Sequence, residues 1–259
     1  MEQPNLTPQK ASKETHLLPN IKPIRACIGS GDDFGYLDLF LLKHGFNPSD
    51  PNIEKIDLDE EPSVLTKNNF SNAGHDTYVI SPANSKDKIS EHFQDCTGVI
   101  VAGVDRDTGE NISIMSHQNP GAFLSAGKNK DQFLNDLAQI LQQIKARCLP
   151  NTVDAVIIGG KYMTIADIVE IDFRQNYLDS LSLLSTEVSS ILGFEPIIIN
   201  GPKLISSADR VLYNNKERRL FFIRGLSRDA VNENTGDFTY SNIAEEKKKW
   251  DKYLATKKS

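Results

Sequence analysis

Hydrophobic residues are densest between residues 78 and 224, and this segment carries the clearest secondary-structure signals of the chain. A continuous apolar run covers residues 99–104, turn-forming residues fill 105–111, and apolar and polar residues alternate over 112–115. An apolar run of strand length, a turn and an alternating segment are together typical of two antiparallel strands. The pattern therefore predicts a β-hairpin at this point in the chain.

Two segments that follow the hairpin repeat their apolar residues at helical spacing. The first segment ends before Pro150, and its apolar stripe consists of Phe133, Leu137, Ile140, Leu141 and Ile144. The second stops at Gly193, because glycine readily adopts the left-handed backbone of a helix C-cap. Its apolar face consists of Tyr177, Leu181, Leu184, Val188, Ile191 and Leu192. We therefore expect two amphipathic helices, each packed on a sheet through its apolar face.

Further short apolar runs predict strands before and after these helices. The predicted strands cover residues 24–28, 153–158, 196–199, 210–213 and 220–223. The last two are separated by a short polar turn, which favours a second hairpin. The order hairpin, helix, strand, helix, strand, hairpin predicts an α/β or α+β fold, in which mixed or antiparallel sheet layers carry helices on their faces.

The rest of the chain divides into three parts around a predicted domain at residues 78–226. Residues 1–22 are polar and without period, so we expect a disordered leader. Residues 23–77 form an N-terminal extension or small lobe, in which a glycine-rich turn and a short helix precede an acidic connector. Residues 227–259 form a charged tail that holds at most one amphipathic helix.

Charge and hydropathy narrow the classes of function. The 259 residues include 29 Lys and Arg against 35 Asp and Glu, which gives a net charge of −6. A negative chain without a basic patch repels polyanions, so we expect no nucleic-acid partner. No run approaches the roughly 18 consecutive apolar residues of a membrane span, and the first residues lack the plan of a signal peptide. We therefore expect a soluble, cytoplasmic protein.

Cysteine and histidine spacing gives no support for a metal site. The chain has five histidines without an H-E-x-x-H pattern, and its three cysteines form no C-x-x-C pair. The cysteines are Cys27, Cys96 and Cys148. We therefore expect neither a metal ion nor an organic cofactor.

One cysteine and one histidine are placed where they can act together. Cys96 stands at the start of the first strand of the predicted hairpin, and His117 stands at the end of the second. Antiparallel strands fold these ends back together, with paired Cα atoms about 4.5–5.5 Å apart. An imidazole beside a thiol takes its proton, and the thiolate then attacks a carbonyl, which suits hydrolysis of an amide. Two other interpretations stay open, an inert buried thiol and a histidine that caps the turn.

The same residues carry a resemblance to a known family. Residues 96–105, followed after a turn by 113–117, resemble the catalytic hairpin of the CheD family of chemoreceptor glutamine deamidases, whose pattern is Cys-V-A-V and then G-M-A-His. The predicted helix, the strand that ends in Gly159 and Gly160, and the later elements follow in that family's order. The similarity covers residues 78–224. The cytotoxic necrotizing factor group of toxin deamidases also uses a catalytic cysteine and histidine on a similar fold.

The resemblance implies a cysteine-dependent protein-glutamine deamidase, which converts a glutamine side chain to glutamate and releases ammonia. It implies Cys96 as the nucleophile and His117 as the general base. Ser90 stands six residues before the cysteine, where the family has Thr, and its hydroxyl would hold the imidazole by a hydrogen bond. A helix N-cap or loop serine is the other interpretation of Ser90. The implied partner is a protein that carries the glutamine, such as a chemoreceptor, and the implied role lies in chemotaxis.

The residues before Cys96 depart from the family pattern, which usually has a Gly-Ser step there. This chain has Phe93, Gln94 and Asp95 instead. Small residues at this step let backbone N–H groups face the developing oxyanion, and the Asp95 carboxylate disfavours a neighbouring thiolate. Two alternative functions therefore stay open. They are a non-catalytic protein-binding module on the same fold and a cysteine hydrolase of small amides or thioesters.

Overall fold

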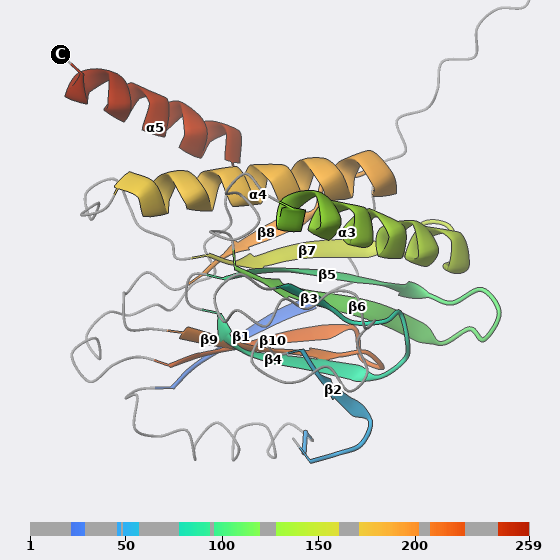
Figure 1. Cartoon of the computed structure of the whole chain (residues 1–259). Helices are drawn as coiled ribbons and strands as arrows, with labels where there is room; N and C mark the ends of the chain where they lie inside the picture. Colours follow the sequence, from blue (N-terminus) through green and yellow to red (C-terminus); the bar gives the residue numbers. More distant parts are fainter. Residues whose placement is uncertain are drawn as a thin grey trace, which may run out of the picture.

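The structure is a computed structural model in which two β-sheets and a layer of helices are stacked (Figure 1). It describes residues 22–28, 46–47, 49–56, 78–93, 96–119, 128–160, 171–201, 208–225 and 243–258. Within these ranges, ten strands form two mixed sheets of five strands each, accompanied by three helices. The predicted mixed α/β class is confirmed. None of the described helices is both long enough and apolar enough to cross a membrane.

The outer sheet has the strand order β1-β10-β9-β4-β2. Its strands are β1 (Lys22–Ile28), β10 (Arg219–Gly225), β9 (Ala208–Asn214), β4 (Asp87–Phe93) and β2 (Ile53–Lys55). Strand β9 pairs antiparallel with both β10 and β4, whereas β1 and β2 pair parallel at the two edges. Both edge strands therefore come from the predicted N-terminal extension, and the inner strands come from the segment after residue 78.

The central sheet has the strand order β3-β6-β5-β7-β8. Its strands are β3 (Tyr78–Ile80), β6 (Asn111–Gln118), β5 (Thr97–Val104), β7 (Asp154–Gly159) and β8 (Ile197–Asn200). All neighbours are antiparallel except β7 and β8, which are joined by a helical crossover and run parallel. Strands β5 and β6 form the predicted first hairpin, and β9 and β10 form the predicted second one.

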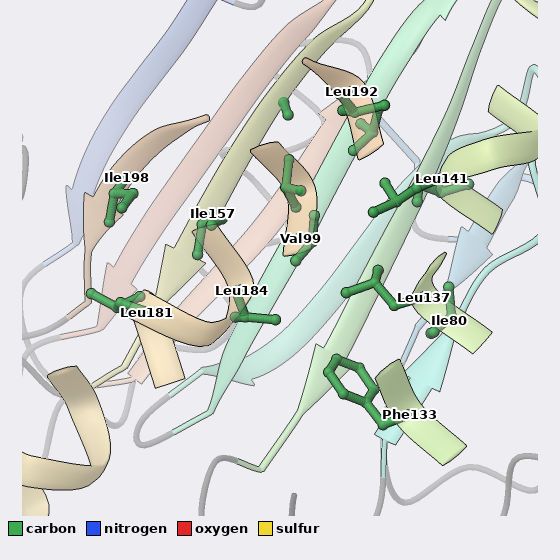
Figure 2. Close-up of a cluster of buried hydrophobic side chains, with 14 of the residues drawn as sticks. Ile80, Val99, Phe133, Leu137, Leu141, Ile157, Leu181, Leu184, Leu192 and Ile198 are labelled. Atoms are coloured by element: carbon green, nitrogen blue, oxygen red, sulfur yellow. The ribbon is translucent and has the colours of Figure 1, made fainter. Parts of the chain in front are cut away.

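Helices α3 (Lys128–Arg147) and α4 (Ile171–Leu192) pack on the face of the central sheet that points away from the outer sheet (Figure 1). Both predicted apolar stripes face this sheet, where Leu137 and Leu181 are completely buried (Figure 2). Helix α5 (Ile243–Lys257) lies across α4, and the side chain of Trp250 is buried in the same hydrophobic core. The tail thus contributes one helix to the helical layer.

The other face of the central sheet packs against the outer sheet. Val99 and Val101 of β5 face the helices, whereas Ile100 and Ala102 belong to the core between the sheets. A strand that is buried on both faces shows a continuous apolar run instead of alternation. This explains the run at residues 99–104 that predicts the strand.

The structure specifies which sheet face the described helices cover. All three lie on one side of the central sheet, and the outer sheet covers the other side (Figure 1). The prediction missed β4, since its buried positions include the polar residues Lys88 and Ser90, which break the alternation expected of a strand. Residues 1–21, the glycine-rich turn with the helix predicted after it, and residues 57–77 of the acidic connector lie outside the described residues.

Candidate active site

The predicted pair of Cys96 and His117 lies at one end of the β5–β6 hairpin. Cys96 immediately precedes β5, and His117 is the next-to-last residue of β6. The register pairs Thr97 with Gln118, so the residue opposite His117 is two positions after Cys96. The two side chains are therefore diagonal neighbours on one face of the sheet, with Cα atoms about 7–8 Å apart in a regular ladder. The hairpin therefore brings Cys96 and His117 near each other, but they are not directly opposite in the strand pairing.

The imidazole of His117 is held from the outer sheet. Its Nδ1 atom lies 2.8 Å from Oγ of Ser90 on β4. The ring of Phe93, also on β4, stacks on the imidazole with centroids 4.0 Å apart and planes 15° from parallel. His117 is 2% exposed, and Ser90 and Phe93 are fully buried. Two residues of one strand therefore fix both the position and the plane of the ring.

The hydroxyl of Ser90 determines which nitrogen of His117 carries the proton. Ser90 Oγ also contacts the backbone carbonyl oxygen of Ile56, which can only accept a hydrogen bond, so the hydroxyl donates there. A hydroxyl that has used its proton must accept from its second partner, and Nδ1–H of His117 is then the donor. This tautomer leaves the lone pair on Nε2. Ser90 is thus a strand residue bonded to His117, and the interpretation as an N-cap or loop serine is wrong.

The backbone of Cys96 is held by the glycine pair at the end of β7. The carbonyl oxygen of Cys96 accepts the N–H of Gly160 at 2.7 Å. Gly159 and Gly160 both have left-handed backbone, with φ of 85° and 72°. A Cβ atom at Gly159 would lie 2.4 Å from the Cys96 carbonyl oxygen, and one at Gly160 would lie 2.8 Å from the ring of Tyr177. Only glycine lets the strand end approach the cysteine this closely.

A group of buried polar residues lies behind the hairpin end, towards α4. Oγ1 of Thr97 accepts the side-chain N–H of Gln118 at 3.2 Å and lies 3.2 Å from the hydroxyl of Ser180 on α4. All three residues are fully buried. Sequence reasoning missed them, although a polar residue at the start of β5 and another at the end of β6 break otherwise apolar strands. Their hydrogen bonds tie the end that carries Cys96 and His117 to the helical layer.

A buried ion pair lies on the same strand as Ser90. Lys88 Nζ is 2.5 Å from Glu54 Oε2 of β2, and the side chains are 0% and 7% exposed. Burial lowers the pKa of the Lys88 ammonium from its ordinary value, and the nearby Glu54 carboxylate opposes that shift. Lys88 and Ser90 are two positions apart on β4 and therefore share one face of the strand. The ion pair lies beside the contact that orients the imidazole.

The described residues contain no group of three or more His, Cys, Asp and Glu side chains that could hold a metal ion. Chemically, the arrangement offers a thiol and, on the same sheet face, an imidazole whose Nε2 can accept its proton. Gln94 and Asp95, which depart from the CheD pattern, lie outside the described residues.

Comparison with models of known protein families finds no match for the chain, and no curated protein matches it significantly.

Proposed function

We propose that this chain is a cysteine-dependent protein-glutamine deamidase of the CheD type, with Cys96 as nucleophile and His117 as general base. The observation that carries the proposal is the contact of 2.8 Å between Ser90 Oγ and His117 Nδ1. The resemblance implies this contact, although the hydrophobic pattern does not predict the strand that makes it. In an activated thiol, the base that faces the thiol is itself oriented by a third group, and the contact with Ser90 supports that role for His117.

The proposed reaction proceeds in two halves. His117 Nε2 takes the proton of the Cys96 thiol, and the thiolate attacks the carboxamide carbon of a glutamine side chain. When the tetrahedral intermediate collapses, the C–N bond breaks and the imidazolium gives its proton to the leaving ammonia. Water, deprotonated by Nε2, then attacks the thioester, and the C–S bond breaks to leave glutamate and the free thiol. The reaction requires no metal and no organic cofactor.

The pH dependence of alkylation at Cys96 tests whether the thiol is activated. We expect iodoacetamide to label Cys96 rapidly near neutral pH and to label it more slowly in a His117→Ala variant, as located by peptide mass spectrometry. Cys148 is a control within the same chain, because it is 2% exposed and burial raises the pKa of its thiol. Slow labelling of wild-type Cys96 that His117→Ala leaves unchanged would overturn the proposal and favour a non-catalytic binding module.

Conversion of glutamine to glutamate tests the reaction and its substrate class. The purified chain is incubated with a chemoreceptor signalling domain that carries glutamines, and conversion of glutamine to glutamate is located by peptide mass spectrometry. We expect conversion with the wild-type chain and none with Cys96→Ser. Activity on free glutamine analogues but not on the protein would instead indicate a hydrolase of small amides.

A further inference from the structure

The acceptor of the Ser90 hydroxyl comes from a segment outside the predicted domain at residues 78–226. Strand β2 pairs parallel with β4, with Glu54 opposite Lys88, and the N–H of Ile56 donates to the carbonyl of Ile89 at 2.8 Å. The Ile56 side chain is completely buried in the core between the sheets. Its carbonyl oxygen accepts the hydroxyl of Ser90. The residue directly after β2 therefore contacts the group that orients His117.

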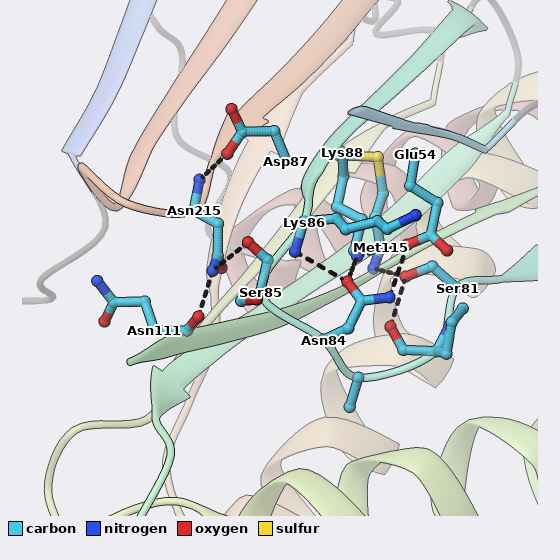
Figure 3. Close-up of polar contacts among 12 residues, drawn as sticks. Glu54, Ser81, Asn84, Ser85, Lys86, Asp87, Lys88, Asn111, Met115 and Asn215 are labelled. Atoms are coloured by element: carbon cyan, nitrogen blue, oxygen red, sulfur yellow. Dashed lines mark hydrogen bonds and ion pairs between the residues drawn. The ribbon is translucent and has the colours of Figure 1, made fainter. Parts of the chain in front are cut away.

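Strand β2 is short and lies at the sheet edge, so side-chain contacts have to fix its register. The Lys88 ammonium donates to Glu54 Oε2 and to Oδ1 of Asn84, and the Asn84 amide donates to Glu54 Oε2 at 3.2 Å (Figure 3). Burying two charges costs free energy that their attraction offsets only in good geometry, so such pairs contribute little net stability and can instead specify one arrangement. Here the arrangement specified is the pairing of Glu54 with Lys88.

We propose that the ion pair between Glu54 and Lys88 positions the active site, by holding β2 in the register in which the Ile56 carbonyl accepts the Ser90 hydroxyl. With that acceptor in place, Ser90 receives Nδ1–H of His117 and Nε2 keeps its lone pair. Without it, the Ser90 hydroxyl is available to donate to Nδ1, which selects the tautomer that carries its proton on Nε2. That tautomer cannot take the thiol proton. The inference rests on the proposed function, in which Glu54 and Lys88 are positioning residues.

The tautomer of His117 is the direct readout, measured by ¹⁵N chemical shifts of the imidazole in the full chain. The test variant is Glu54→Gln with Lys88→Met, which removes both charges together and so leaves neither buried alone. We expect wild type to show Nδ1–H, and the variant to be folded but to carry the imidazole proton mainly on Nε2. Its rate of Cys96 alkylation falls by about tenfold or more, towards the roughly 10²-fold that loss of a general base costs.

Two further variants separate positioning from loss of stability. Asp105→Asn with Arg147→Met removes another ion pair, at the far end of the hairpin, and is expected to leave the tautomer and the alkylation rate unchanged. Glu54→Asp keeps both charges but shortens the reach to Lys88, so it tests the proposal even if the doubly substituted protein fails to fold. We expect it to shift the tautomer in the same direction by a smaller amount.

The outcomes distinguish this inference from the proposed function. If Glu54→Asp and the double variant are folded and keep the wild-type tautomer and alkylation rate, the positioning role is overturned while the activated thiol stands. If wild-type Cys96 is labelled slowly whether or not His117 is present, the proposed function is overturned. In that case the tautomer measurement still decides whether β2 controls the His117 proton.

Discussion

The backbone of Cys96 is held by a glycine, whereas the side chain of His117 is held by side-chain contacts. The N–H of Gly160 donates to the Cys96 carbonyl from a residue with φ of 72°. At that angle an L-residue with a side chain is strained, and the space for a Cβ atom is already filled by Tyr177. A small change at Gly160 therefore reaches Cys96 through one hydrogen bond.

Gly160→Ala is expected to destabilise the protein and to slow alkylation of Cys96. Left-handed backbone costs about 1–2 kcal/mol for alanine, and crowding against Tyr177 adds about 1–3 kcal/mol. Gly109→Ala is the matched control, because Gly109 has the same φ of 72° but open space around the position of a Cβ atom. Urea unfolding measures the free energy of unfolding of both variants. An equal loss of stability in the two variants would show that the strand end relaxes and that the Cβ atom at residue 160 is not crowded.

We expect Asp105 to make the stability of the folded protein sensitive to acid. Its carboxylate accepts the backbone N–H of Asp107 at 2.9 Å and the guanidinium of Arg147 at 2.5 Å, and these contacts hold its pKa below the ordinary value of 3.8. A lowered pKa in the folded state gives stability that is present above the ordinary value and lost as pH falls through the folded one.

Asp105→Asn removes this titration, so its unfolding free energy is expected to fall less steeply than that of wild type below about pH 4. Urea unfolding across an acid pH series measures the slope. Glu110→Gln, which removes an exposed carboxylate from the same turn, is the control and should leave the slope near that of wild type. If the free energy of unfolding of wild type and Asp105→Asn has the same dependence on pH, the lowered pKa of Asp105 is contradicted.

At the scale of elements, helix α5 buries the side chain of Trp250 in the core beside α4, and Tyr253 and Leu254 pack against the same core. The indole N–H of Trp250 donates to Oε1 of Gln175 at 2.7 Å, and its ring is 1% exposed. The ion pair between Lys247 and Asp179, at 3.6 Å, is more than a third exposed at both side chains and contributes little. Burial of the indole therefore contributes to docking of the tail, together with the apolar contacts of Tyr253 and Leu254.

Trp250→Ala is expected to lower the free energy of unfolding by about 3–5 kcal/mol, the cost of deleting a buried aromatic side chain. Trp250→Phe keeps one aromatic ring in the core and loses the hydrogen bond, which costs about 1 kcal/mol, together with part of the apolar contact, so its total loss is expected to lie between that figure and the loss in Trp250→Ala. Both variants lose the only tryptophan of the chain, so tryptophan fluorescence cannot report their unfolding. Circular dichroism is used to follow unfolding in urea instead. If Trp250→Ala changes hydrogen exchange within α5 alone and not global stability, α5 is an independent unit.

At the scale of the whole molecule, polar contacts join the two sheets at both ends. The end that carries Cys96 and His117 has the contact between Ser90 and His117. At the other end, the β9–β10 turn reaches the central sheet, where Arg218 pairs with Asp154 at 2.6 Å and Asn215 donates to the Asn111 carbonyl (Figure 3). The apolar core lies between these ends, so loss of either set of contacts loosens one end of the sandwich.

Arg218→Met is expected to cost about 3–5 kcal/mol, because it leaves the buried Asp154 carboxylate without the guanidinium. Adding Asp154→Leu removes that charge and is expected to recover most of the loss. Urea unfolding of the single and double variants measures both steps. The rate of Cys96 alkylation should stay near the wild-type rate in the double variant, since the change lies at the opposite end of the strands.

The sequence by itself determined the elements whose signal is local. The β5–β6 hairpin follows from an apolar run and an alternating segment joined by a turn, and α3 and α4 follow from their helical stripes. Because a hairpin pairs residues that are near in sequence, it also placed Cys96 and His117 at one end of the same two strands. The apolar run at residues 99–104 marks β5 in the sequence because this strand is buried on both faces.

Only the tertiary structure decided how the second sheet completes the site. Strand β4 escapes hydrophobic patterning because Lys88 and Ser90 occupy buried positions, and such positions become acceptable only when partners from elsewhere satisfy them. Those partners are Glu54 on β2, the carbonyl of Ile56 directly after β2, and His117 on the facing sheet. Periodicity reports which face of an element is apolar, whereas the register between distant strands is set by how two layers pack. For that reason the sequence predicts the pair of residues, and the stacking of the sheets decides how the imidazole is oriented.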